Sequence, residues 1–170
     1  MITVLIETRN DEDGLARTLG SLVSAAVEGV VREVIVVDRG STDHTAAVAD
    51  HAGCGFIANG DLASGVKRAR GEWLLLLEPG ARLADGWIED AVHHMSRLTN
   101  PARFSRASSI GARFLSRFFT ARRPLADGLL VSKPQAVARL KPGEGAEALV
   151  RGLSSKRLGA LISSSERARR

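Results

Sequence analysis

The sequence contains a single cysteine, Cys54, among 170 residues, so it can form neither an internal disulfide nor a cysteine-rich zinc site. No run of apolar residues approaches the roughly 20 that a membrane-spanning helix needs. The first ten residues lack the basic start and the small-residue cleavage site of a secretory signal. These absences predict a cytoplasmic protein, and the length predicts one domain with a core of its own.

Charge is unevenly distributed along the chain, although the net charge is only +5. Residues 1–95 carry 15 acidic and 8 basic side chains, whereas residues 96–170 carry 4 acidic and 16 basic ones. The basic part could attract phosphate groups, anionic lipid or nucleic acid, or it could be a solvated face with a disordered tail. Because no nucleic-acid-binding motif is present, we expect no nucleic-acid partner.

The first hundred residues alternate between strand and helix patterns. Residues 2–6 and 34–37 are continuous apolar runs, as expected of strands that are covered on both faces. Further strands are expected at 55–58 and 72–77, with helices over 11–23, 43–52, 62–70 and 85–98. This order predicts an α/β fold with a mostly parallel, doubly wound sheet flanked by helices. No G-x-G-x-x-G follows the first strand, which disfavours a dinucleotide-binding domain.

Polar residues follow each of the four expected strands. In chain order they are Thr8 and Asn10, Asp38, Asn59 and Asp61, and Glu78. Ligands of open α/β sheets bind beyond the carboxyl ends of the strands, so these residues are candidates for one binding site. The same side chains also suit the capping of helices and turns, and the pattern leaves both roles open.

The part of the chain after Pro101 has a different character. Residues 103–123 hold six arginines and no acid, with four phenylalanines between them. From about Ser109 this pattern suits a helix, either packed on the sheet or lying at a membrane surface. A strand is expected at 129–132, one or two helices over 134–161, and a frayed tail at 163–170.

Several segments resemble glycosyltransferases of family 2. The stretch VIVVDRGSTDHT (34–45) is similar to the family signature Val-Asp-Asp-Gly-Ser-Thr-Asp, with Arg39 in place of the second Asp. VLIETRNDED (4–13) resembles the opening strand and turn, with Glu7 in place of a proline. ASGVKRARGEWLLLLEPGARL (63–83) resembles the segment that ends in the family's metal-binding acids, and ADGLLVSKPQAVARL (126–140) more weakly resembles an acceptor-side segment.

The resemblance implies a GT-A fold and the transfer of a hexosyl group from a nucleotide-diphosphate sugar to an acceptor hydroxyl, with inversion. It implies a nucleotide site built from Thr8, Asn10, Asp38, Arg39 and Asp61. It implies that Glu78 binds Mg²⁺ or Mn²⁺, which bridges the diphosphate. A later carboxylate takes the proton from the acceptor, and the candidates are Glu144, Glu147 and Asp127.

The sequence departs from the family pattern at positions that bind the metal or act as the base in the family. Glu78 is the only acid where the family has two, and Glu144-Gly145 stands where a Glu-Asp pair is expected. Arg39 reverses the charge of its position, and it could bind the diphosphate and partly replace the cation. The alternatives are a member that binds a nucleotide sugar without transferring it, and a basic module that binds lipid or nucleic acid through 103–123.

The resemblance also divides the chain. We expect residues 1–100 to form the nucleotide-sugar-binding half and residues 101–162 to form a basic, helical acceptor side of the same domain, followed by the tail. The acceptor is unidentified, and a lipid-linked one would fit contact of 103–123 with the inner face of the membrane. Arg122 and Arg123 could grip the diphosphate or belong to a solvated basic face.

Overall fold

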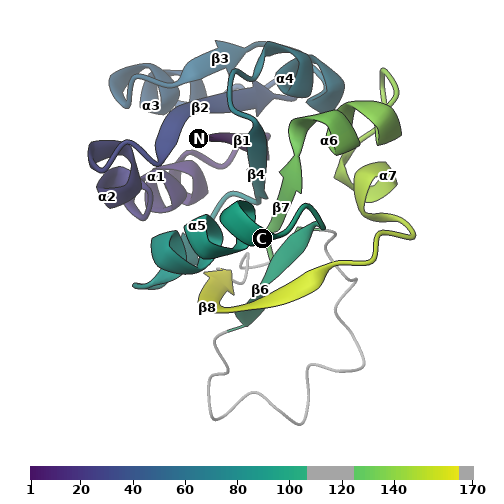
Figure 1. Cartoon of the computed structure of the whole chain (residues 1–170). Helices are drawn as coiled ribbons and strands as arrows, with labels where there is room; N and C mark the ends of the chain where they lie inside the picture. Colours follow the sequence, from purple (N-terminus) through teal and green to yellow (C-terminus); the bar gives the residue numbers. More distant parts are fainter. Residues whose placement is uncertain (107–124, 165–170) are drawn as a thin grey trace, which may run out of the picture.

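The fold is described from a computed structural model, which covers residues 1–106 and 125–164. Its centre is one eight-stranded sheet with the strand order β3-β2-β1-β4-β7-β6-β8-β5 (Figure 1). The strands are β1 (Ile2–Thr8), β2 (Val31–Asp38), β3 (Gly55–Ile57), β4 (Trp73–Leu77), β5 (Ala81–Leu83), β6 (Ala102–Arg106), β7 (Leu129–Ser132) and β8 (Lys156–Ser164).

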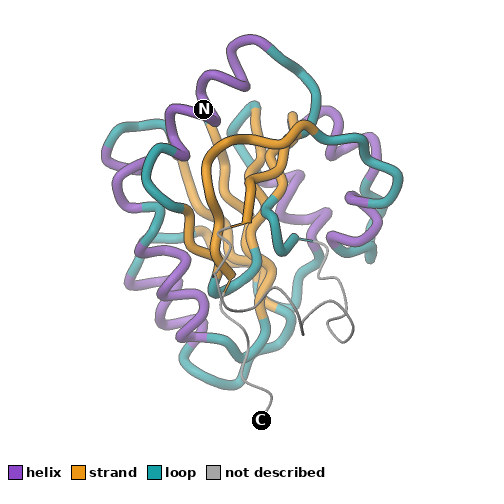
Figure 2. Tube along the Cα trace, turned by 90° about the horizontal axis from the view of Figure 1, so that it is seen from below, coloured by secondary structure: helices purple, strands orange, loops and turns teal. Residues whose placement is uncertain are grey.

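Helices cover both faces of this sheet, as the view along it shows (Figure 2). They are α1 (Glu12–Gly20), α2 (Val23–Val27), α3 (Thr45–His51), α4 (Leu62–Arg68), α5 (Trp87–Arg97), α6 (Lys133–Arg139) and α7 (Ala146–Val150). Buried residues of α1, α2, α3 and α5 belong to one apolar cluster, and those of α4, α6 and α7 belong to another. The molecule is therefore a three-layer α/β/α domain, which confirms the expected fold class.

Strand β4 shows why an unbroken apolar run forms a central strand. Trp73, Leu75 and Leu77 point into one cluster, whereas Leu74 and Leu76 point into the other. Successive strand side chains face opposite sides of a sheet, so a strand covered on both faces must be apolar throughout. β4 pairs in parallel with β1, which pairs in parallel with β2, and β2 pairs in parallel with β3. The four strands predicted in the first hundred residues are confirmed.

The expectation of a helix reaching residue 161, with a tail from 163, is wrong for residues 156–164. These residues form β8, which pairs in parallel with β6 and antiparallel with β5. Its apolar residues Leu158, Ala160 and Ile162 are buried at every second position, which is the period of a strand and not of a helix. The helices expected over 134–161 are confirmed only as α6 and α7.

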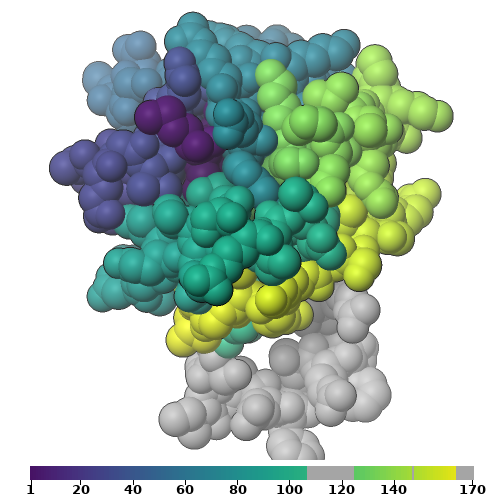
Figure 3. Space-filling view, in the orientation of Figure 1, coloured from purple at the N-terminus to yellow at the C-terminus, as the bar shows by residue number. Residues whose placement is uncertain are grey.

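Strand β8 lies beside α5 on the face shown in the space-filling view (Figure 3). The backbone N–H of Ala160 donates to the carboxylate of Asp90 on α5 at 2.6 Å, which joins the two elements. The helix expected from about Ser109, and most of the basic segment 103–123, lie outside the described residues. Within the described ranges, no helix combines the length and apolar character needed to cross a membrane.

Candidate functional site

The carboxyl ends of β1, β2 and β4 meet at one edge of the sheet. Thr8 lies opposite Asp38 in the pairing of β1 with β2. Ile6 lies opposite Leu77 in the pairing of β1 with β4, so Glu78 leaves the sheet beside Glu7 and Thr8. Alternation of strands and helices therefore brings together side chains that are 70 residues apart in sequence, as the polar pattern predicted.

A pocket of about 350 Å³ opens at this edge. Its walls come from the ends of β1 and β4, from Arg39 after β2, and from two residues of the second part of the chain. The lining residues are Glu7, Thr8, Arg9, Asp11, Arg39, Leu77, Glu78, Pro79, Leu125 and Ala146. Three predicted site residues, Thr8, Arg39 and Glu78, thus share one hollow.

An ion pair lines the pocket, formed by two residues that both depart from the family pattern. The guanidinium of Arg39 lies 3.3 Å from the carboxylate of Glu7. Burial raises the pKa of Glu7, an effect that the positive charge of Arg39 opposes and the negative charge of Asp61 reinforces. The sequence analysis named Arg39 as a site residue but not Glu7, and no local signal links two residues 32 positions apart.

Thr8 places a buried hydroxyl in the pocket. Its side chain is 3 % exposed, and its Oγ1 has no hydrogen-bond partner among the described residues. A buried hydroxyl without a partner costs roughly 1–3 kcal/mol, and a bound ligand is one way in which the missing bond is supplied. Thr8 therefore has the properties of a ligand-binding residue.

Glu78 is positioned by the turn that ends β4. The N–H of Ala81 donates to the carbonyl of Glu78 at 3.1 Å, and Gly80 has a φ of 85° that favours glycine. Glu78 Oε1 accepts a hydrogen bond from the N–H of Leu125 at 3.3 Å. The Pro-Gly turn thus holds this carboxylate at the pocket, at the position where the sequence predicted a metal ligand.

Asp38 and Asn10 organise the loops around the pocket and do not line it. Asp38 is buried, and it accepts from the N–H groups of Gly40 and Ser41 at 3.1 and 3.0 Å and from the Ser41 hydroxyl. Asn10 accepts from the N–H of Thr42 at 2.7 Å. The capping role that the sequence left open for Asp38 is therefore present, and a direct role in nucleotide binding stays a prediction.

Asp61 caps α4 and connects it to the loop before α7. Its carboxylate accepts from the N–H of Ser64 at 2.8 Å, from the Ser64 hydroxyl and from the N–H of Gly143 at 2.7 Å. The Ser64 hydroxyl and the two N–H groups lower the pKa of Asp61 to about 2. Asp61 does not line the pocket, and its predicted contact with nucleotide stays a prediction.

We expect Asp61→Ala to lower the free energy of unfolding at pH 7 by about 1 kcal/mol, the usual worth of a helix N-cap. The pKa of Asp61 lies below its unfolded value of 3.8, so its stabilising effect exists above that pH and disappears as the pH falls toward 2. Urea unfolding at pH 7, 4 and 2 measures this, with the exposed Asp50→Ala as control. A difference between wild type and Asp61→Ala that persists at pH 2 contradicts the assignment.

Two of the candidate bases, Asp127 and Glu144, are each two positions from a residue that lines the pocket. Both carboxylate oxygens of Asp127 are bound, one by Arg106 and the other by Arg157 at 3.3 Å, and Asp127 does not line the pocket. Glu144 Oε2 accepts from the N–H of Lys141 at 2.9 Å, and it lies two residues before the pocket-lining Ala146. Neither acid lines the pocket, and a catalytic role for either stays a prediction.

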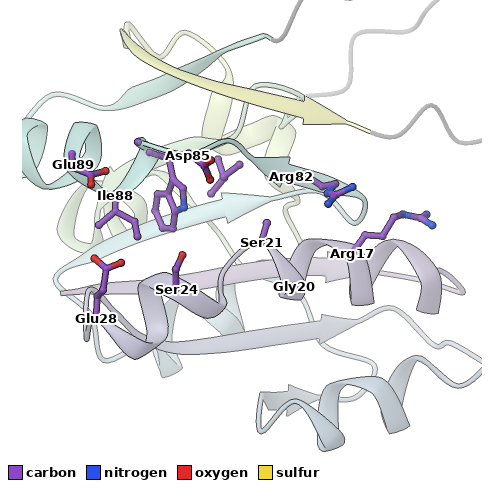
Figure 4. Close-up of a pocket in the computed structure, with 12 residues that line it drawn as sticks. Arg17, Gly20, Ser21, Ser24, Glu28, Arg82, Asp85, Ile88 and Glu89 are labelled. Carbon is purple, nitrogen blue, oxygen red and sulfur yellow. The ribbon is translucent and has the colours of Figure 1, made fainter.

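A second hollow, of about 630 Å³, lies between the α1–α2 segment and the β5–α5 segment (Figure 4). Arg17 and Arg82 lie at one end of it, and Glu28 and Glu89 lie at the other (Figure 4). None of the predicted site residues lines this hollow. It is also away from the carboxyl ends of β1 and β2, so we assign the candidate site to the smaller pocket.

Comparison with known proteins agrees with this fold. The family model described as glycosyl transferase family 2 matches residues 3–126, a range that includes every pocket-lining residue except Ala146. The chain therefore belongs to glycosyl transferase family 2, and its class is that of a nucleotide-sugar glycosyltransferase. No curated protein sequence matches the chain.

Solved structures with the same fold include glucosyl-3-phosphoglycerate synthase from Mycobacterium tuberculosis. Its complex with Mg²⁺ and UDP is 17 % identical with a TM-score of 0.70, and the match covers 99 % of this chain and 72 % of that one. Its complex with Mn²⁺, UDP and glucosyl-3-phosphoglycerate is 16 % identical with a TM-score of 0.67, covering 99 % and 73 %. At this identity the likeness establishes the GT-A-like fold.

The residues of the pocket can be tested for their fit to a divalent cation. Among the described residues, no group of three or more His, Cys, Asp or Glu side chains could hold a metal ion. Mg²⁺ in phosphate-binding sites is often held by only one or two carboxylates, with substrate phosphates and water completing its ligands. The pocket therefore fits a cation held by Glu78 together with a diphosphate, and it does not fit a metal site built by the protein alone.

Proposed function

We propose that this protein transfers a hexosyl group from a nucleotide-diphosphate sugar to an acceptor hydroxyl, with inversion at the anomeric carbon. The observation that carries the proposal is the pocket that holds the buried hydroxyl of Thr8, the Glu7–Arg39 pair and Glu78 at one sheet edge. Family membership supports the reaction class, and the pocket is the place where we propose that the donor binds.

In this proposal the nucleotide lies over the ends of β1 and β2. Thr8 Oγ1 gains the hydrogen-bond partner that the described residues do not supply. Asp38 holds the loop after β2 so that Arg39 faces the pocket, because its carboxylate fixes the N–H groups of Gly40 and Ser41. A preformed loop lowers the entropy lost on binding.

Glu78 would hold Mg²⁺ or Mn²⁺ at the β4 side of the pocket. The cation, when bound, neutralises negative charge that develops on the leaving diphosphate. Glu78 itself contributes a carboxylate kept in place by the Leu125 N–H and by the turn through Gly80. The solved synthase complexes contain Mn²⁺ or Mg²⁺ with UDP, which supports the choice of metal.

Glu144 is the residue that we propose as the general base. It precedes the pocket-lining Ala146, so a modest movement of the loop before α7 would bring its carboxylate to an acceptor hydroxyl. Removal of that proton would promote direct displacement on the face opposite the diphosphate, which gives inversion. Asp127 is the weaker candidate, because Arg106 and Arg157 occupy its oxygens.

The remaining predictions concern the partners of the protein. A cytoplasmic location, a lipid-linked acceptor and contact with the inner membrane face through 103–123 stay predictions from the sequence. One of the solved synthase complexes contains UDP-glucose and phosphoglyceric acid, so a small phosphorylated acid is included among the acceptors tested.

The proposal is tested with radiolabelled UDP-, GDP- and dTDP-hexoses, with and without Mn²⁺, against a panel of hydroxyl acceptors. We expect transfer or slow hydrolysis of one donor that is stimulated by metal, and binding of the same donor by calorimetry. Binding without transfer or hydrolysis for any donor would instead establish the protein as a nucleotide-sugar-binding member of the family. Absence of binding to every donor would overturn the proposal.

A further inference from the structure

Glu7 and Arg39 form an ion pair in the smaller pocket, which we call the donor pocket because the sugar donor is proposed to bind there. The pair is suited to recognising an uncharged group. The Arg39 guanidinium and the Glu7 carboxylate are 3.3 Å apart, with 41 % and 22 % of their side chains exposed. Because the two opposite charges are so close together, their fields largely cancel farther away. The pair therefore has little net attraction for a phosphate. It still presents hydrogen-bond acceptors and donors side by side to whatever enters the pocket.

The backbone fixes the position of both residues. The N–H of Arg39 donates to the carbonyl of Thr8 at 2.9 Å, which extends the β1–β2 ladder past the last paired residues. Glu7 lies near the end of β1 and Arg39 follows the neighbouring strand β2, and both line the pocket. Glu78, the proposed diphosphate side, follows β4 on the other side of β1. In the proposed binding mode, with the nucleotide over the ends of β1 and β2, the part of the donor next to the pair is its nucleobase.

We propose that Glu7 and Arg39 read the base of the sugar donor and select guanine, an inference that rests on the function proposed above. Guanine presents two adjacent N–H donors, at N1 and N2, next to its O6 carbonyl. A carboxylate can accept both N–H groups, and an adjacent guanidinium can donate to the carbonyl oxygen. The Glu7–Arg39 pair supplies one carboxylate and one adjacent guanidinium.

Other bases match the pair less completely. Uracil has one N–H between two carbonyls, so the carboxylate gains one hydrogen bond and its second oxygen faces a carbonyl oxygen. Adenine and cytosine have an amino group next to an unprotonated ring nitrogen and lack the paired N–H donors. Burial raises the pKa of Glu7 even though Arg39 is nearby. Hydrogen bonds made in such a partly dehydrated place distinguish more strongly between one base and another.

The test is calorimetric titration of the full chain with GDP, UDP, ADP and CDP in Mn²⁺ buffer. We expect the wild type to bind GDP most tightly. The glutamine amide of Glu7→Gln can accept only one N–H of guanine, and its own NH₂ group faces the second guanine N–H. We therefore expect the affinity of this variant for GDP to fall about tenfold. The same variant should keep or improve its affinity for UDP, since an amide can pair with the N–H and one carbonyl of uracil.

Two further variants make the result decisive. Glu12→Gln alters a carboxylate that pairs with His44 outside the pocket, and it should leave all four affinities unchanged. Arg39→Gln, at an exposed position, should weaken GDP and UDP together because both lose the donor to their carbonyl. Melting temperatures show whether each variant is folded, and the comparison of GDP with UDP in the wild type carries the test if Glu7→Gln is not.

The outcomes separate the two proposals. A wild type that binds UDP at least as tightly as GDP, or a Glu7→Gln variant that weakens all nucleotides by one factor, overturns guanine selection and leaves the transferase proposal intact. A folded wild type that binds none of the four nucleotides overturns the transferase proposal itself.

Discussion

Replacing Glu78 with glutamine is expected to lower the rate of hexosyl transfer by about a hundredfold, because a cation bound with a diphosphate supplies several kcal/mol of charge stabilisation. Glutamine has the same shape, and its amide oxygen can still accept the hydrogen bond from the Leu125 N–H. What it removes is the negative charge at the β4 side of the pocket. The fold should be unaffected, since Glu78 lies at the end of the strand and outside the apolar clusters.

Two measurements separate loss of metal binding from other causes. Titration of nucleoside diphosphate in the presence and absence of Mn²⁺ should show that the metal strengthens binding to the wild type but not to Glu78→Gln. Glu28→Gln, an equivalent change at an exposed residue outside the donor pocket, should behave as wild type in both assays. If Glu78→Gln retained metal-stimulated transfer at the wild-type rate, Glu78 would not be the metal ligand.

The positions of Thr8, Arg39 and Glu78 could be predicted because each follows an apolar run that had to become a central strand. Once the order of strands and helices is fixed, the carboxyl ends of parallel neighbours meet at one edge. Residues such as Asp38 and Asp61 were harder to assign, because an acid after a strand can cap the next turn or bind a ligand. Their hydrogen bonds to backbone N–H groups show that both cap turns or helices, and their contact with nucleotide stays a prediction.

The parts that sequence patterns missed depend on contacts between distant residues. Strand β8 alternates buried and less buried residues over a short stretch, and its partner β6 lies about 50 residues earlier in the chain. Glu7 and Arg39 are each unremarkable as surface charges, and only the pairing of β1 with β2 places them together. Local sequence patterns do not show which charged residues, distant along the chain, will form an ion pair in the pocket.

A tight contact at the opposite edge of the sheet depends on Gly71, just before β4. A Cβ atom at this position would lie 2.5 Å from the backbone nitrogen of Thr3 and 2.9 Å from the carbonyl carbon of Ile2. The N–H of Gly71 also donates to the hydroxyl of Thr3 at 2.8 Å, and that hydroxyl donates to Glu33 at 2.9 Å. Glycine is thus required here because the chain passes close to the backbone of β1.

We expect Gly71→Ala to lower the free energy of unfolding by about 3 kcal/mol, the upper part of the range for overpacked sites, because the backbone of β1 must move to admit the methyl group. Urea denaturation measures the change. Gly20→Ala, at a helix end where a Cβ meets nothing within 4 Å, is the matched control and should be neutral or slightly stabilising. Adding Thr3→Ala removes the hydroxyl but not the backbone contacts, so it should restore little of the loss. A Gly71→Ala protein as stable as the Gly20→Ala protein would contradict this prediction. It would show that β1 and β4 can move apart at this end without loss of stability, so their close packing would not explain the positions of the pocket residues at the other end.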